Sequence, residues 1–191
     1  VNEMEVAYHY INKPVTIIGV TGSNGKTTTV TLIYEVLKRA LVPVKLGGNI
    51  GTPLSAIVGT LQDHDILLLE ISDHQLIDMV DFKTNISVLT NLCPTHLDYH
   101  GSYENYKSVK KKIFNHHTKE DIAILNAANY DSLELTKDIP STKYYFNNDE
   151  NYIADGKIYI DKKEVIDTSD ILIKGTHNYE NILATYLVAK E

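Results

Sequence analysis

The sequence has a single cysteine, Cys93, so no disulfide bond can form within the chain. A lone cysteine suits the reducing cytosol, and we expect a cytoplasmic protein. Positive charge is also scarce, because 18 Lys and Arg stand against 25 Asp and Glu, a formal net charge of −7. Proteins that hold nucleic acid need an excess of Lys and Arg, so this balance argues against a nucleic-acid partner.

Long hydrophobic runs are absent too. No uninterrupted apolar stretch reaches the roughly 20 residues that a membrane-spanning helix needs, and residues 1–5 are no signal peptide, so we expect no membrane association. A chain of 191 residues, 43% of them hydrophobic, can bury one sizeable core, and we expect a single domain over residues 1–191, acting as a monomer. The sequence lacks an initiator Met and stops inside an apparent helix, so we expect a fragment of a longer protein.

Short apolar runs alternate with helical patterns along the chain. The runs are nearly all apolar, as expected for parallel strands covered on both faces, and they lie at residues 15–20, 66–69, 86–90 and 122–125. Apolar residues at helical spacing predict a helix over 27–41, and a second helix, with lysines on its outer face, is predicted over 103–114. This order predicts an α/β fold whose mostly parallel sheet binds ligands at the carboxyl ends of its strands.

The pattern changes in the last third of the chain. Short alternating strands are predicted from about residue 144 to residue 173, with turns at Asp155-Gly156 and Asp161-Lys162, which indicates a small antiparallel appendage. A final helix is predicted over 179–190, opened by residues 175–178.

A glycine-rich loop follows the first predicted strand and precedes the first long helix. It reads Gly22-Ser23-Asn24-Gly25-Lys26-Thr27-Thr28. Glycines let backbone N–H groups approach phosphate oxygens, and the helix dipole favours the anion, so the sheet is predicted to be of the P-loop type. Lys26 would reach the β- and γ-phosphates of a nucleotide, and the Thr27 hydroxyl would bind Mg²⁺. Position 20, where the general P-loop has a further glycine, is Val20, and the alternative is a glycine turn with an incidental Lys-Thr pair.

Other polar residues stand at predicted strand ends. Glu70 ends a buried run, where a carboxylate is costly unless a cation meets it, and either Mg²⁺ or a salt bridge at the sheet margin would supply one. His96 and Asp98 are candidate metal or phosphate contacts, although a lone loop histidine is more often structural. His9, His64, His116 and His117 are predicted to lie on the surface. No Cys/His spacing of a zinc site occurs, so the expected metal is Mg²⁺.

Together these segments resemble the Mur ligase family, cytoplasmic ATP-dependent ligases that build the peptidoglycan stem peptide. In the family's order and spacing, the matching segments are Gly19 to Thr28, Gly48-Asn49-Ile50-Gly51, Glu70-Ile71-Ser72, Thr90-Asn91 through His96-Leu97-Asp98, Tyr106 to Lys110, and Gly175 to Asn181. That family also lacks the more distant P-loop glycine, which accounts for Val20. The resemblance implies the central ATP-binding domain, without the N-terminal domain that grips the UDP-sugar and the C-terminal domain that brings the amino acid.

Within the family, Glu70-Ile71-Ser72-Asp73-His74-Gln75-Leu76 looks most like the ligase that adds D-glutamate to UDP-N-acetylmuramoyl-L-alanine. That ligase usually reads Glu-Leu-Ser-Ser-Phe-Gln-Leu here, so Asp73 and His74 depart from its pattern. The rival is the next ligase of the pathway, which adds lysine or diaminopimelate. The implied reaction is attack of the substrate carboxylate on the γ-phosphate of ATP, followed by attack of the amino group on the resulting acyl phosphate.

The resemblance also implies roles for single residues. Nucleotide contacts are implied for residues 22–28, with Lys26 neutralising phosphate, for Asn49 near the γ-phosphate, and for Asn178 and Asn181 near adenine. Thr27 with Glu70 would hold the first Mg²⁺, while His96 and a CO₂-derived carbamate on Lys110 would hold the second. Ser72 and Gln75 would face the sugar nucleotide.

Asn178, Asn181 and Lys110 also have plainer alternatives. The asparagines can serve as helix caps or surface residues, and Lys110 can share a solvated face with Lys111 and Lys112. The isolated chain is expected to be inactive in ligation, and a non-catalytic binding fragment or another P-loop NTPase or kinase remains an alternative. Residues 12–15, Asn-Lys-Pro-Val, do not supply the Asn-Lys-x-Asp motif of a GTPase.

Overall fold

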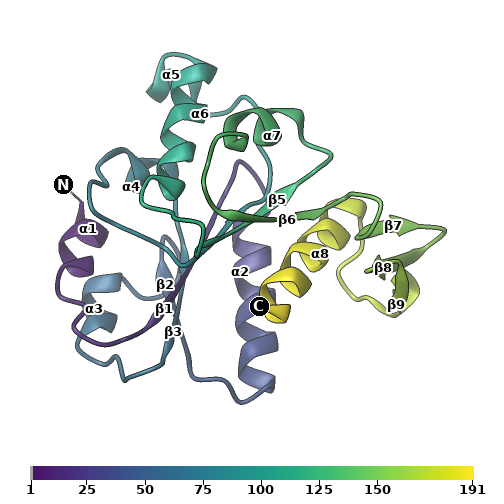
Figure 1. Cartoon of the computed structure of the whole chain (residues 1–191), viewed down its shortest axis with the longest axis horizontal. Helices are drawn as coiled ribbons and strands as arrows, with labels where there is room; N and C mark the ends of the chain where they lie inside the picture. Colours follow the sequence, from purple (N-terminus) through teal and green to yellow (C-terminus); the bar gives the residue numbers. More distant parts are fainter. Residues whose placement is uncertain (1) are drawn as a thin grey trace.

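The computed structural model describes residues 2–191 and is built on a six-stranded parallel sheet (Figure 1). The strand order is β2-β3-β1-β4-β5-β6, and all five pairings are parallel. The strands are β1 Thr16–Thr21, β2 Val44–Gly48, β3 Ile66–Glu70, β4 Ile86–Leu89, β5 Ile122–Asn126 and β6 Thr142–Phe146. The predicted α/β class and mostly parallel sheet are confirmed, as are the four predicted central strands.

The two outer strands depart from the prediction. No strand was predicted at β2, and residues 144–146, assigned to the antiparallel appendage, belong to β6, which pairs in parallel with β5. Both strands form edges of the sheet and are largely half-exposed. Edge strands need no continuous apolar run, so the signal that marks the central strands is missing from them.

Helices cover both faces of the sheet. The helices are α1 Glu3–Tyr8, α2 Lys26–Arg39, α3 Leu54–Val58, α4 Asp73–Ile77, α5 Leu97–His100, α6 Tyr103–Lys111, α7 Tyr130–Thr136 and α8 Thr176–Lys190, with 3-10 turns η1 Lys112–Phe114 and η2 Thr168–Asp170. Helices α2 and α8 pack together against one face (Figure 1), and α1, α3, α4 and α6 pack against the other. The predicted helices over 27–41 and 179–190 are therefore confirmed with shifted ends.

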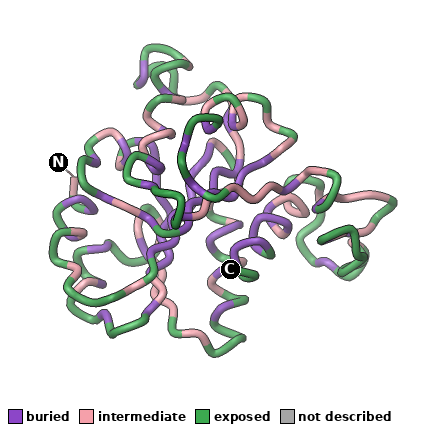
Figure 2. Tube along the Cα trace, viewed as in Figure 1, coloured by how far each residue is buried: buried purple, intermediate pink, exposed green. Residues whose placement is uncertain are grey.

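The buried residues form one core on each side of the sheet. Alternate residues of β3 show the division, because Leu67 and Leu69 join the core under α1, α3, α4 and α6, and Leu68 joins the core under α2 and α8. Each of these three side chains is fully buried. Figure 2 shows the buried stretch running through the centre of the sheet. Side chains of both faces are covered, which explains the near-continuous apolar runs of the central strands.

The appendage is a three-stranded antiparallel sheet of β7 Tyr152–Ala154, β8 Lys157–Ile160 and β9 Lys163–Asp167 beside α8 (Figure 1). Both predicted turns are confirmed. Asp155-Gly156 and Asp161-Lys162 have positive φ at both positions, the conformation that two-residue hairpin turns favour. Ile158 on β8 is buried in the core of α2 and α8, which attaches the appendage to the domain. In the described part of the chain, no helix is both long and apolar enough to cross a bilayer.

His117 was predicted on the surface, and this prediction is wrong. The ring is buried, with Nε2 at 2.9 Å from Thr84 Oγ1 and 3.1 Å from Ser87 Oγ, and Nδ1 at 2.8 Å from Ser141 Oγ. These hydroxyl partners come from distant segments, so the local sequence holds no sign of them. Burial lowers the pKa of His117 from 6.5 to about 4, a shift that the nearby Lys83 charge supports and the Asp121 charge opposes.

The buried imidazole predicts a loss of stability in acid. Between pH 6.5 and about pH 4 the unfolded chain binds a proton at His117 that the folded chain does not, so the free energy of unfolding should fall by up to about 3 kcal/mol across this window. Urea unfolding at several pH values measures this slope. His117→Gln should be less stable than the parent at pH 7 and lose less stability on acidification. An unchanged slope in the variant would show that another group is responsible.

Candidate nucleotide and metal site

The phosphate loop lies at the carboxyl end of β1 and is held by the segment that follows β4. Ser23 N donates to Asn91 O at 2.9 Å, Asn24 N donates to Asn91 Oδ1 at 3.0 Å, and Thr90 Oγ1 donates to Asn24 O at 2.6 Å. These contacts fix the backbone of the loop before any ligand arrives.

The two glycines of the loop are required by its shape. Gly22 and Gly25 have φ of 143° and 82°, which other residues rarely adopt. A Cβ atom at Gly22 would lie 2.0 Å from Thr90 Oγ1, and one at Gly25 would lie 2.5 Å from Asn181 Oδ1. Gly25 begins α2 without a side-chain cap, so the first N–H groups of that helix, at residues 26–28, face the mouth of the loop. This is the arrangement that binds phosphate.

Lys26 bends back over the loop that precedes it. Its Nζ atom donates to Gly22 O at 2.9 Å and to Ser23 O at 3.1 Å. The ammonium group is therefore held above the backbone N–H groups, where it adds positive charge to the same place.

Three residues from separate segments meet at the end of β3. The buried Glu70 carboxylate accepts a hydrogen bond from Thr27 Oγ1 at 2.7 Å and another from Asn49 Nδ2 at 2.8 Å. Asn49 N also donates to Glu70 O at 2.8 Å. Both partners of the carboxylate are neutral, so it is not held by a salt bridge with them. The Thr27 hydroxyl and the Glu70 carboxylate together are hard oxygen donors, which fit Mg²⁺.

A second group of charged residues lies beside the first. His96 adopts the left-handed conformation, with φ of 51°, at the start of α5 and is half-exposed. Its Nδ1 is 3.0 Å from Asp73 Oδ2, and Nε2 of the buried His100 is 2.7 Å from the same oxygen. The other carboxylate oxygen, Oδ1, is 3.6 Å from Lys110 Nζ. Asp98 lies exposed on α5.

Asp73 is the negative centre of this group. Burial of the carboxyl raises its pKa, but hydrogen bonds from His100 and His96 and the charge of Lys110 outweigh burial and hold the pKa well below its usual value. The side chain is therefore a buried anion that joins the two histidines to Lys110.

Lys110 is fully buried, which overturns the alternative of a solvated lysine face. It lies one helical turn after the buried Tyr106, with Nζ 5.4 Å from the centre of that ring and donating to Thr21 Oγ1 at 3.1 Å. Burial lowers the pKa of Lys110 to about 7, aided by the charge of Lys26 and opposed by those of Asp73 and Glu70. Lys111 and Lys112 are only partly buried.

Ser72 and Gln75 form the capping box that begins α4. Gln75 N donates to Ser72 Oγ at 3.3 Å, and Ser72 N donates to Gln75 Oε1 at 2.9 Å. This pair therefore has a structural role in placing Asp73 on the first turn of α4. Its predicted contact with the sugar nucleotide stays a prediction.

Asn178 and Asn181, the two asparagines predicted near adenine, lie in the same helix but in different surroundings. A cavity of about 390 Å³ adjoins the phosphate loop and is lined by Asn24, Gly25, Thr90, Asn91, Phe146, His177, Glu180 and Asn181. Asn181 is buried at its wall, whereas Asn178 does not line it and donates from Nδ2 to Lys174 O at 2.9 Å. The helix N-cap is Gly175, so the capping alternative for Asn178 is wrong, while its contact with adenine stays a prediction.

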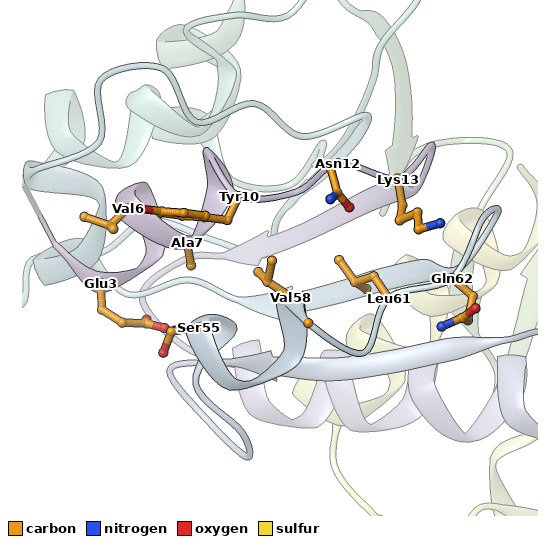
Figure 3. A pocket seen from close by; sticks show the side chains of 11 residues that line it. Glu3, Val6, Ala7, Tyr10, Asn12, Lys13, Ser55, Val58, Leu61 and Gln62 are labelled. Carbon is orange, nitrogen blue, oxygen red and sulfur yellow. The ribbon is translucent and has the colours of Figure 1, made fainter.

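A larger cavity, of about 820 Å³, lies between α1 and α3 (Figure 3). It is lined by apolar side chains that include Val6, Tyr10, Val58 and Leu61, with Lys13 and Gln62 at one end. Lys13 and Gln62 precede β1 and β3, so the cavity lies toward the amino ends of the strands, away from the phosphate loop. No residue predicted for the site lines it.

Sequence reasoning missed Asp73, His100 and Phe146 as members of these sites. Asp73 was noticed only as a departure from the family pattern. The spacing of His96 and His100, four residues apart, places both on one side of a helical turn and could have pointed to a pair. Phe146 lies on the edge strand β6, whose last residues were assigned to the antiparallel appendage.

Comparison with known proteins agrees with this geometry. Residues 20–189 match the Mur ligase middle domain. UDP-N-acetylmuramoylalanine–D-glutamate ligase of Streptococcus suis (strain 98HAH33) is 42% identical over 190 residues, which cover 97% of this chain and 42% of the relative. The ligase of the same name from Geobacillus sp. (strain WCH70) is 43% identical over 195 residues, covering 100% of this chain and 43% of the relative. The chain thus spans about two fifths of the length of the curated relatives it matches.

Solved structures show the same fold. A crystal structure of MurF from Acinetobacter baumannii has a TM-score of 0.76 at 17% identity, covering 98% of this chain and 45% of that one. MurF ligase from Thermotoga maritima in complex with ADP has a TM-score of 0.69 at 22% identity, covering 97% of this chain and 47% of that one. The match over residues 20–189 extends from the end of β1 to the end of α8. The chain belongs to the Mur ligase family, as a member that contains its middle domain.

Proposed function

We propose that the chain is the ATP-binding part of a cytoplasmic ligase that joins D-glutamate to UDP-N-acetylmuramoyl-L-alanine. The observation that carries the proposal is the meeting of Lys26, held over the phosphate loop, with the Thr27–Glu70 pair at the end of β3. The names of the relatives at 42% and 43% identity support the choice of D-glutamate over lysine or diaminopimelate.

The proposed reaction needs charge neutralisation and not a protein nucleophile. The substrate carboxylate attacks the γ-phosphorus of ATP, the bond to the bridging oxygen breaks, and ADP leaves an acyl phosphate behind. The amino group of D-glutamate then attacks the acyl carbon, and phosphate leaves as the amide forms. Lys26 and the N–H groups of residues 26–28 would bind phosphate oxygens in the first step, and Asn49 would lie near the γ-phosphate.

Two Mg²⁺ positions fit the donor groups present. Thr27 and Glu70 would hold the first ion, and His96 with a carbamate on Lys110 would hold the second. Bound Mg²⁺ supplies positive charge against the transferred phosphoryl group. Carbamylation requires a neutral amine, and the buried Lys110, with its lowered pKa, meets this requirement. Asn181, at the wall of the adjoining cavity, would approach adenine, with Asn178 at the same end of α8.

The sugar nucleotide and the amino acid would be held mainly by other parts of the protein. Ser72 and Gln75, at the start of α4, would face the sugar nucleotide. The relatives are more than twice as long as this chain, and we assign binding of the UDP-sugar and of the amino acid mainly to domains outside these 191 residues.

Substitution of Lys26 tests nucleotide binding. Lys26→Ala removes the ammonium group above the phosphate loop and should weaken Mg²⁺–ATP binding by about 10- to 100-fold, since a hydrogen bond to a charged group contributes roughly 1.5–3 kcal/mol. Isothermal calorimetry measures the affinity. Lys38→Ala, near the far end of the same helix, is the matched control and should bind like the parent. Equal affinities for all three proteins would refute the site.

The 191-residue chain alone should not catalyse ligation, because bringing two reactants into line supplies a large part of such a rate enhancement. Incorporation of labelled D-glutamate into UDP-N-acetylmuramoyl-L-alanine measures the activity, with a longer chain as the positive control. Product formed by residues 1–191 would contradict the assigned domain roles. Lysine or diaminopimelate incorporated by the longer chain in place of D-glutamate would identify the rival ligase.

We predict that Lys110 is carbamylated in the longer chain. Labelled CO₂ should give a carbamate signal in ¹³C NMR, and Lys110→Ala should abolish both this signal and ligation, with partial recovery of activity in excess acetate. Lys111→Ala and Lys112→Ala are the controls and should stay near normal. Normal activity of Lys110→Ala together with loss in either control would show that the wrong lysine has been assigned.

A further inference from the structure

The buried carboxylate of Asp73 contacts four side chains at once, and one of them is the neighbouring His74, whose Nδ1 is 3.6 Å from Oδ2. Oδ2 is within 3.0 Å of His96 Nδ1 and 2.7 Å of His100 Nε2, and Oδ1 is 3.6 Å from Lys110 Nζ. Asp73 is buried and held at the first turn of α4 by the Ser72–Gln75 capping box. One fixed anion therefore connects both residues assigned to the second metal.

We propose that Asp73 is a positioning residue that holds His96 in the tautomer and orientation needed for that metal. A carboxylate accepts hydrogen bonds only, so the nitrogen of each histidine that faces Asp73 must carry the proton. In His96 this is Nδ1, which leaves the lone pair of Nε2 free to bind a metal. A ring nitrogen bonded to a carboxylate while the other binds the ion is the arrangement by which proteins orient metal-binding histidines.

His100 contacts the same oxygen, Asp73 Oδ2, through its other type of ring nitrogen. Its Nε2 faces Asp73, so its proton lies on Nε2. The ring is buried and makes a T-shaped contact with Tyr106, at 5.3 Å between ring centres. His100 thereby supports the carboxylate from the buried side, while His96 remains half-exposed. The geometry predicts two histidines on one oxygen in different tautomers, a signature that a general packing role for Asp73 would not produce.

Imidazole ¹⁵N NMR of the 191-residue chain measures the tautomers directly. In the parent, His96 should be protonated on Nδ1 and His100 on Nε2. In Asp73→Ser, which removes the carboxylate that faces His96 Nδ1, His96 should shift to a mixture dominated by the Nε2–H form. Asp73→Asn is a second variant that keeps the shape of the side chain and one acceptor oxygen. Circular dichroism checks that both variants are folded. Glu104→Gln, which removes an exposed carboxylate of α6 that pairs with Lys107, is the control and should leave His96 unchanged.

Metal affinity gives the second readout. This part rests on the proposed function, in which His96 contacts the second ion. With Mn²⁺ as the probe, in the presence of ATP and bicarbonate, Asp73→Ser should weaken the second ion by about 10-fold or more and leave the first, at Thr27 and Glu70, unchanged. Electron paramagnetic resonance of free Mn²⁺ measures both affinities.

The outcomes separate the two proposals. The same His96 tautomer in the parent and in Asp73→Ser overturns the positioning role, and so does a second Mn²⁺ bound equally tightly by both. A parent chain that binds only one Mn²⁺ with ATP contradicts the proposed second metal, and the tautomer comparison then still decides whether Asp73 positions His96.

Discussion

Buried charges at the carboxyl edge of the parallel sheet constrain the whole site. Glu70, Asp73 and Lys110 lose nearly all contact with water, and a buried charge is tolerated only when neighbouring groups compensate it. The two anions lie close together in sequence, at the end of β3 and the start of α4, so the compensating groups must come from elsewhere. Thr27 and Asn49 reach Glu70, and His96, His100 and Lys110 reach Asp73. These contacts bring together the loops after β1, β2 and β4 and the helix α6.

This convergence gives the site its rigidity. The phosphate loop is bonded to residues 90 and 91 after β4, and α2, which begins at the loop, packs against α8, which carries Asn181. The phosphate end and the cavity proposed for adenine therefore belong to one packed unit. A nucleotide would meet groups that are already in place, so little ordering would oppose its binding.

Much of the site could be predicted from the sequence, because its residues stand at the ends of recognisable apolar runs. The strand before Gly22 and the run before Glu70 are buried on both faces, so each gives a clear signal and ends at a defined point. The edge strands β2 and β6 give no such signal, and residues 144–146 of β6, with Phe146, were assigned to the wrong sheet. His117 and Asp73 were misjudged for another reason: the hydroxyl partners of His117, and His96, His100 and Lys110 around Asp73, lie 23 to 37 residues away along the chain. A local pattern carries no information about them.

The left-handed backbone of His96 costs conformational energy at a residue that contacts Asp73. A side chain at φ of 51° is strained by roughly 1 kcal/mol or more relative to glycine, although histidine tolerates the region better than most residues. Glycine at position 96 would relieve the backbone, but it would also remove the imidazole that hydrogen-bonds the buried Asp73 carboxylate. A hydrogen bond to a charged group contributes roughly 1.5–3 kcal/mol, which exceeds the strain that glycine would remove. The imidazole thus offsets the cost of its own backbone conformation, and stabilisation of this domain by consensus substitution should leave position 96 untouched.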